Sequence, residues 1–189
     1  MPDNLDIPVL VASIRRGRES PKVARHVHRL LEARDGVTSD LVDLAELDLP
    51  IMEERVRLRD DSPAGALALS AAIDRADGLV IVTPEYNNGY PGVLKNALDY
   101  LRPELKRLPV GVVTVSAGGF GGIACLAQLR LVLLAMGAVP IPVSLPVSKV
   151  QTSFTEDGPA DGSFDPRALR FLDELLWWTT AAHRMGGRK

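Results

Sequence analysis

Residues 78–91 read Gly-Leu-Val-Ile-Val-Thr-Pro-Glu-Tyr-Asn-Asn-Gly-Tyr-Pro. The first six residues are almost wholly apolar and rich in Val and Ile, which is typical of a strand buried on both faces of a parallel sheet. The residues after it are turn formers, and Pro91 is well suited to the start of a helix. The stretch therefore predicts a strand, a polar loop and a helix in direct succession.

The same succession recurs along the chain on both sides of this stretch. Further apolar runs are found at 7–12, 41–44, 110–116 and 139–143. Helix starts are indicated at Ser20-Pro21, at Ser62-Pro63, near residue 122 and at Asp165-Pro166. Run 41–44 is the weakest, since it carries Asp43 and follows Asp40, and we expect an edge strand there. Strands alternating with helices predict an α/β three-layer sandwich with right-handed crossovers.

Length and composition are those of an ordinary globular protein. The 189 residues are 46% hydrophobic and 24% charged, which predicts a single domain over 1–189 with an ample core. Two long loops stand out, at 46–61 and at the start of the C-terminal segment 149–185. Long loops in compact domains are often functional.

Charge and residue usage exclude several classes of protein. A net charge of −2 argues against a nucleic-acid partner, because phosphate binding needs clustered cations. The lone Cys125 excludes a disulfide framework and a cysteine-based zinc site. We expect the three histidines to be solvated and not to bind metal. The N-terminus is acidic where a signal peptide is basic, and its apolar run is too short to span a bilayer, so we expect a cytoplasmic protein without a membrane partner.

Three loops follow the first, third and fourth apolar runs, and ligands of open α/β sheets bind at the carboxyl ends of the strands. Loop 12–21 offers hydroxyls, arginines and a helix N-terminus, which together favour a phosphate monoester. Loop 83–91 can present amides and aromatic rings to a planar heterocycle, although its residues also suit a plain turn.

Loop 116–122 holds four glycines, which allow the backbone to approach a ligand closely. Residues 119–124 match G-x-G-x-x-A. A dinucleotide fold places this pattern after its first strand, with an acid about 20 residues later. Here the pattern follows the fourth strand and no acid is present at the required position, so we reject the dinucleotide-binding interpretation.

Together these loops resemble the NADPH-dependent FMN reductase family of flavodoxin-like proteins. The resemblance rests on Ser-x-Arg-x-x-Arg-x-Ser at 13–20, on Pro-Glu-Tyr-Asn at 84–87 leading into Pro-Gly-Val-Leu-Lys-Asn-Ala-Leu-Asp at 91–99, and on Ser-x-Gly-Gly-x-Gly-Gly at 116–122. It implies a five-stranded parallel sheet of order 2-1-3-4-5. Two positions depart from the family pattern: Ala12 stands where Gly is usual, and Gly89 where Ser is frequent.

The resemblance also implies FMN as cofactor and assigns residues to it. The phosphate site would comprise Ser13, Arg15, Arg18 and Ser20. The ribityl and isoalloxazine contacts would be Pro84, Glu85, Tyr86 and Asn87, and the pyrimidine end of the ring would contact Ser116, Gly118 and Gly119.

The expected function is transfer of hydride from NADPH or NADH through FMN to a quinone, azo compound, metal oxyanion or free flavin. The cofactor carries this chemistry, so no catalytic side chain is nominated; a loop carboxylate paired with cations is the simpler interpretation of Glu85. The alternatives are a flavodoxin-like electron carrier and a non-catalytic flavin-binding regulatory subunit. The arginines of the first loop favour the enzyme. The family implies a homodimer or homotetramer, with helix 91–102 and Trp177-Trp178 as candidate surfaces.

Overall fold

Strand β5 (Leu79–Pro84) is buried along its whole length at the centre of a five-stranded sheet. The strands are all parallel, in the order β4-β2-β5-β6-β7. In chain order these are the second, first, third, fourth and fifth of the expected strands, so the predicted order 2-1-3-4-5 is confirmed. The structure is a computed structural model that describes residues 4–186.

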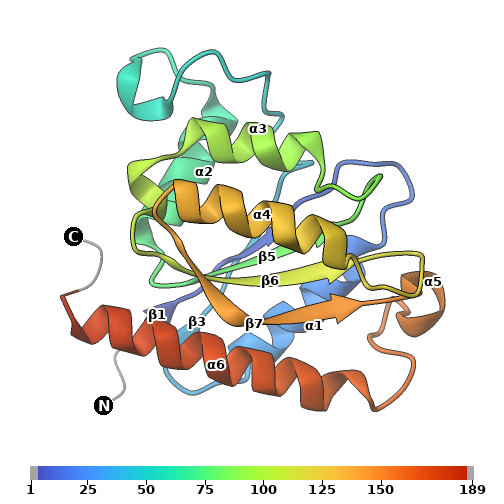
Figure 1. Cartoon of the computed structure of the whole chain (residues 1–189). Coiled ribbons are helices and arrows are strands. Elements are labelled where there is room, and N and C mark those ends of the chain that lie inside the picture. The colour runs from blue at the N-terminus through green and yellow to red at the C-terminus, as the bar shows by residue number, and fades with distance from the viewer. Residues whose placement is uncertain (1–3, 187–189) are drawn as a thin grey trace.

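The helices cover both faces of this sheet, which gives the predicted three layers (Figure 1). Helices α1 and α6 lie on one face, and α2, α3 and α4 lie on the other. The strands are β1 (Leu5–Asp6), β2 (Val9–Val11), β3 (Val37–Thr38), β4 (Leu41–Asp43), β5, β6 (Pro109–Val115) and β7 (Val139–Val147). The helices are α1 (Ser20–Glu32), α2 (Ala64–Arg75), α3 (Gly92–Tyr100), α4 (Ile123–Ala135), α5 (Val150–Ser153) and α6 (Phe164–Arg184), with 3₁₀ turns at Val56–Leu58 and Pro103–Leu105.

The core consists of two apolar clusters, one on each side of the sheet. Successive side chains of a strand point to opposite faces. Accordingly Val80 and Val82 of β5 pack in the cluster beneath α1 and α6, whereas Leu79 and Ile81 pack in the cluster beneath α2, α3 and α4. Burial on both faces explains why the central strands are apolar at nearly every position.

Both edges of the sheet differ from the five apolar runs expected from the sequence. β1 and β3 form a short parallel pair that extends the β2–β4 ladder past Pro8, through the hydrogen bonds from Ile7 N to Thr38 O and from Val9 N to Asp40 O. β7 is longer than the expected 139–143 and carries Pro140, Pro142 and Pro146, with a register irregularity opposite β6. Prolines of this kind are tolerated on an edge strand.

The helix starts agree with the sequence to within about two residues, although the serine of the Ser20-Pro21 start signal does not cap α1. Ser20 is the first residue of α1 and not its N-cap, because Glu19 occupies that position without a side-chain cap. The loop 46–61 contains the 3₁₀ turn Val56–Leu58, and the loop after Lys149 contains α5, which no sequence signal indicated.

The sequence suggested that the three histidines are solvated, but each of them has a hydrogen-bond partner in the structure. His26 Nε2 lies 2.6 Å from Asp165 Oδ1, His28 Nδ1 lies 3.1 Å from Ser39 Oγ, and His183 Nδ1 lies 3.0 Å from Asp77 Oδ1. They tie helices α1 and α6 to neighbouring segments. Within residues 4–186 no group of three or more His, Cys, Asp or Glu side chains is arranged to hold a metal ion. No helix in this range is long and apolar enough to cross a membrane.

Candidate functional site

The carboxyl ends of β2, β5 and β6 meet at one edge of the sheet, where the loops that follow them enclose a cavity of about 110 Å³. Most of the predicted site residues line it, and Asn87, Gly118 and Gly119 lie outside its wall. The wall consists of Ser13, Arg15, Gly17, Arg18, Glu19, Ser20, Pro84, Glu85, Tyr86, Val115, Ser116, Ala117, Val150 and Gln151. The parallel arrangement of the strands thus brings the three loops together as the sequence predicted.

The floor of the cavity joins the first loop to the second. Ser13 is fully buried, and its Oγ lies 2.8 Å from the hydroxyl oxygen of Tyr86. The Ser13 carbonyl accepts a hydrogen bond from Arg18. The first contact joins the two loops, and the second braces the first loop internally.

Arg18 is used mainly to hold this loop against β4. Its terminal nitrogens donate to the two carboxylate oxygens of Asp43 at 2.5 and 2.6 Å. The hydrogen bond to Asp43 raises the pKa of the Arg18 guanidinium above its ordinary value, against the opposing effect of burial. A paired guanidinium of this kind positions the loop, and less of it is available for a ligand.

Arg15 is the exposed cation of the cavity wall. Its guanidinium carbon lies 6.0 Å from the centroid of the Tyr86 ring, at the outer limit of a cation–π contact. It forms no ion pair with any residue in the range 4–186 that the structure describes. Ser20 lines the same wall from the first turn of α1, where unsatisfied N–H groups favour an anion. Arg15 and this helix end therefore fit a phosphate.

The second loop closes in a tight hairpin turn. Tyr86 and Gly89 exchange two backbone hydrogen bonds, of 2.8 and 2.9 Å. Between them Asn87 and Asn88 have positive φ angles of 51° and 63°, the pattern of a type I′ turn, which Asn adopts readily. Asn87 is exposed at the tip of this turn, outside the cavity wall.

Glu85 has a role that the sequence did not predict. Its carboxylate accepts hydrogen bonds from the backbone N–H groups of Ala124, at 3.0 Å, and Cys125, at 3.1 Å. It therefore caps the N-terminus of α4 from a distant loop, and the expected pairing with cations is wrong. Burial, with a contribution from the Glu85 carboxylate, raises the pKa of the Cys125 thiol to about 12. This thiol stays protonated and unreactive at neutral pH.

The four glycines of the third loop have two different roles. Gly121 and Gly122 have positive φ, and a Cβ on them would lie 2.7 Å from Pro146 Cβ and 2.9 Å from Thr114 Cβ. Only glycine fits there. By contrast, a Cβ on Gly118 or Gly119 would meet nothing within 4 Å. These two residues leave open space next to the cavity, which fits the close approach of a flat ring.

Several wall residues were missed by the sequence analysis. Val150 and Gln151 belong to α5, whose four residues follow β7 and carry no motif. They reach the cavity because Val150 N donates to Ser116 O at 3.1 Å and Lys149 N donates to Gly118 O at 3.0 Å. Only the length of β7, which the prolines obscured in the sequence, could have indicated this placement.

The residues present fit FMN. Arg15 and the start of α1 suit its phosphate, the walls formed by Pro84 and Tyr86 suit the ribityl chain and ring, and the open backbone at Gly118 and Gly119 suits the ring edge.

Comparison with known proteins agrees with this geometry. The family model for NADPH-dependent FMN reductase matches residues 5–152. A quinone reductase of Escherichia coli (strain K12) is 38% identical over 143 residues, covering 74% of each chain. An NAD(P)H-dependent FMN reductase of Schizosaccharomyces pombe is 35% identical over 156 residues, covering 76% of this chain and 75% of the relative.

A solved structure gives the same result. The flavoenzyme NAD(P)H:(acceptor) oxidoreductase FerB of Paracoccus denitrificans superimposes with a TM-score of 0.76 at 27% identity, covering 93% of this chain and 97% of that chain. With the cavity, the sheet order and the matched residues in agreement, the chain belongs to the NADPH-dependent FMN reductase family.

Proposed function

We propose that the protein takes hydride from NADPH or NADH and passes the electrons through FMN to a small-molecule acceptor such as a quinone, azo compound, metal oxyanion or free flavin. The observation that carries this proposal is the single cavity in which Arg15, the Ser13–Tyr86 pair and the open glycine backbone of the third loop converge. When bound there, FMN supplies the hydride-accepting and electron-donating chemistry.

The protein's contribution is to bind and orient. Arg15 and the first turn of α1 hold the phosphate, with the guanidinium fork matched to phosphate oxygens. Ser13 and Tyr86 hold the inner wall through their mutual hydrogen bond. Gly118 and Gly119 keep side chains away from the space beside the ring. Each of these groups acts by placement, so none of them needs to exchange a proton with the substrate.

The two acidic groups that meet at the start of α4, Glu85 and Cys125, are not suited to acid–base catalysis. The Glu85 carboxylate is engaged with the N-terminus of α4. The Cys125 thiol is buried, with a pKa of about 12. We therefore assign no catalytic side chain, and the reaction depends on the cofactor and on access to it.

The proposal includes a cytoplasmic homodimer or homotetramer. Its support is the outer face of α4, where Ile123, Leu131 and Leu134 are exposed, next to Phe120, which is 87% exposed. Exposed apolar patches of this kind mark association sites. Trp177 offers a second exposed surface, whereas Trp178 packs partly against the core. Sedimentation of the wild-type protein and of Leu131→Glu tests whether α4 is the association surface. We expect the wild-type protein to be an oligomer and the substitution to dissociate it. A monomeric wild-type protein would contradict the proposal.

The absorption spectrum of the purified protein, before and after anaerobic NADPH, tests the function. We expect a flavin spectrum that bleaches on addition of NADPH and recovers when a quinone is added. A flavin spectrum that NADPH and NADH leave unchanged would instead indicate the electron carrier or the regulatory subunit. Failure to retain or bind any flavin would refute the site itself.

A further inference from the structure

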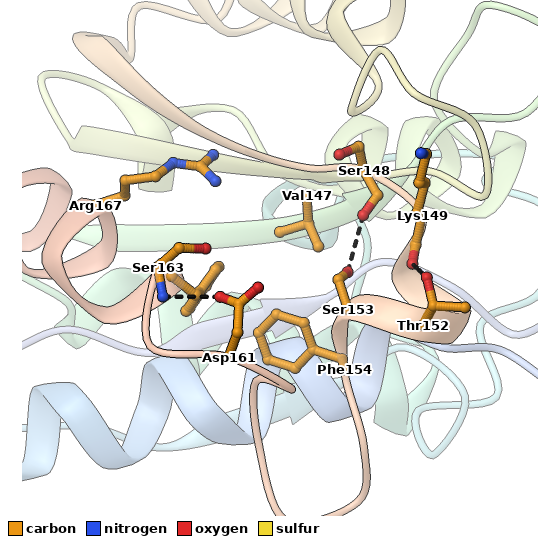
Figure 2. A pocket seen from close by; sticks show the side chains of 10 residues that line it. Val147, Ser148, Lys149, Thr152, Ser153, Phe154, Asp161, Ser163 and Arg167 are labelled. Atoms are coloured by element: carbon orange, nitrogen blue, oxygen red, sulfur yellow. Dashed lines mark hydrogen bonds between the residues drawn. The ribbon is translucent and has the colours of Figure 1, made fainter.

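A second cavity, of about 290 Å³, lies between the end of β7, α5 and the first turn of α6 (Figure 2). It borders the first cavity, because four consecutive residues line the two cavities between them. Val150 and Gln151 line the first cavity, and Lys149 and Thr152 line the second. Its lining is largely polar: Val147, Ser148, Lys149, Thr152, Ser153, Phe154, Asp161, Ser163, Phe164 and Arg167. Much of this wall lies beyond residue 152, where the match to the family ends.

Two cations line this cavity, Lys149 just before α5 and Arg167 on α6, and they lie on opposite sides of it in Figure 2. Within residues 4–186 neither forms an ion pair, although Arg18, Arg57 and many other arginines of the chain do. Arg167 is held in place by donating to Pro146 O at 2.6 Å. Two cations without carboxylate partners leave their charge available to an anionic ligand.

The backbone at Lys149 also connects the two cavities. Its φ of 49° is in the left-handed region, which a lysine adopts at some cost. Its N–H donates to Gly118 O, so the residue that presents the ammonium group is tied directly to the glycine loop of the first cavity. A ligand bound by Lys149 would therefore lie close to the third loop of the first cavity.

One acidic residue restricts the kind of anion that fits. Asp161 lines the same wall, and hydrogen bonds from Ser163 lower the pKa of its carboxyl group below the ordinary value. An ionised carboxylate repels a bare anion but accepts a hydrogen bond from a sugar hydroxyl. Two cations with an acid and several hydroxyls thus suit a phosphorylated sugar better than inorganic phosphate.

We propose that this second cavity binds the phosphorylated adenosine ribose of NADPH, with Lys149 and Arg167 on the 2′-phosphate and Asp161 on the ribose. The proposal rests on the proposed function, in which the nicotinamide end of the same nucleotide reaches the flavin bound in the first cavity. Because NADH lacks the 2′-phosphate, the second cavity makes the protein prefer NADPH.

A calorimetric titration tests the cavity without any redox reaction. The full-length protein, saturated with FMN so that the first cavity is filled, is titrated with adenosine 2′-monophosphate, adenosine and inorganic phosphate. We expect the nucleotide to bind at least tenfold more tightly than either fragment. Lys149→Ala and Arg167→Ala should each weaken it by about 10- to 150-fold, the effect of one charge-assisted contact.

Arg170→Ala is the matched control, because Arg170 is exposed on the same helix but does not line the cavity. An equal loss in this control would show a mere effect of net charge and overturn the proposal. Inorganic phosphate binding as tightly as the nucleotide would overturn it too, since the cavity would then be a simple anion site.

Steady-state kinetics supply the second readout. The ratio of KM for NADPH to KM for NADH should rise at least tenfold in Lys149→Ala and in Arg167→Ala, and an unchanged ratio would refute the assignment. If neither nucleotide bleaches the flavin of the wild-type protein, the proposed function fails. The calorimetric titration still decides separately whether the cavity binds a phosphorylated ribose.

Discussion

The carboxylate of Glu85, in the loop after β5, accepts a hydrogen bond of 3.1 Å from the backbone N–H of Cys125 at the start of α4. Since Ala124 N donates to the same oxygen, one side chain joins the second loop of the site to the helix that follows the third. The positive end of the helix dipole favours a carboxylate in this place. The relative position of these two loops at the cavity therefore depends on Glu85.

Replacement of Glu85 by Ala should lower the free energy of unfolding of the apoprotein by about 1 kcal/mol, the usual effect of losing an N-cap acceptor. Glu85→Gln retains an acceptor and should lose about half as much, through the loss of charge at the helix end. Urea unfolding of the apoprotein measures both. Unchanged apoprotein stability with a large loss of FMN affinity would mean that the carboxylate acts on the cofactor instead.

Arg15→Ala should lower FMN affinity, whereas Arg18→Ala should lower the stability of the apoprotein. Loss of Arg15 removes a phosphate contact worth about 1.5–3 kcal/mol, or about 10- to 150-fold in FMN affinity, with little change in apoprotein stability. Loss of Arg18 leaves the largely buried Asp43 carboxylate unpaired, which should cost the apoprotein about 1–3 kcal/mol. Fluorescence titration with FMN and thermal unfolding distinguish the two. Equal behaviour of the variants would contradict these roles.

FMN should bind at least tenfold more tightly than riboflavin, because the exposed guanidinium of Arg15 and the start of α1 are suited to the phosphate that riboflavin lacks. Quenching of flavin fluorescence measures both affinities under the same conditions. Equal affinities would show that the first loop does not bind phosphate. In Arg15→Ala the preference should decrease.

Stability should fall in acid through Glu104, which is only 1% exposed. Burial alone would raise the pKa of this carboxyl group, but hydrogen bonds from Arg57, the backbone and Ser70 bring it below the ordinary value. The folded protein thus binds this proton more weakly than the unfolded chain, so its stabilising contribution is present at neutral pH and is lost as the pH falls below about 4. Urea unfolding at several pH values measures the slope. Glu104→Gln should be less stable at pH 7 and show a shallower decline in acid; an unaltered slope would refute this.

The reaction should follow a ping-pong scheme, because one open face of a ring can stack with only one partner at a time. Double-reciprocal plots of rate against NAD(P)H at several acceptor concentrations should be parallel. In stopped-flow experiments NAD(P)H alone should bleach the flavin at least as fast as turnover. Intersecting lines, or bleaching only after addition of the acceptor, would show that both substrates bind together.

The apolar runs of the sequence predicted the five main strands because these strands are buried on both faces, as the alternation of Val80 and Ile81 between the two clusters illustrates. The order of the strands came from the resemblance to a family. The short β1–β3 pair was missed, because two-residue strands carry too little pattern to be detected.

The structure brings most of the predicted site residues together around one cavity, and it adds contacts that the sequence did not indicate. Loops at the carboxyl ends of parallel strands must meet, so their residues were predictable. The cap that Glu85 provides was not, because nearly 40 residues separate it from its partners and only the packing of α4 brings them together. The pairing of Arg18 with Asp43 was missed for the same reason, and the placement of α5 depends on how far β7 extends.

The prolines of β7 have a consequence for association. The N–H groups of alternate residues in a strand point to opposite sides. Val139 donates its N–H inward to Leu108 O, toward the sheet. Pro140, Pro142 and Pro146 are at the alternate positions, whose N–H groups would point outward. The missing donors are therefore those that would point away from the sheet, where an additional strand would need them. This edge is a poor template for strand addition, which protects the chain from amyloid-like stacking. A second copy is therefore not expected to add a strand beside β7, and replacing these prolines with valine would supply the missing donors.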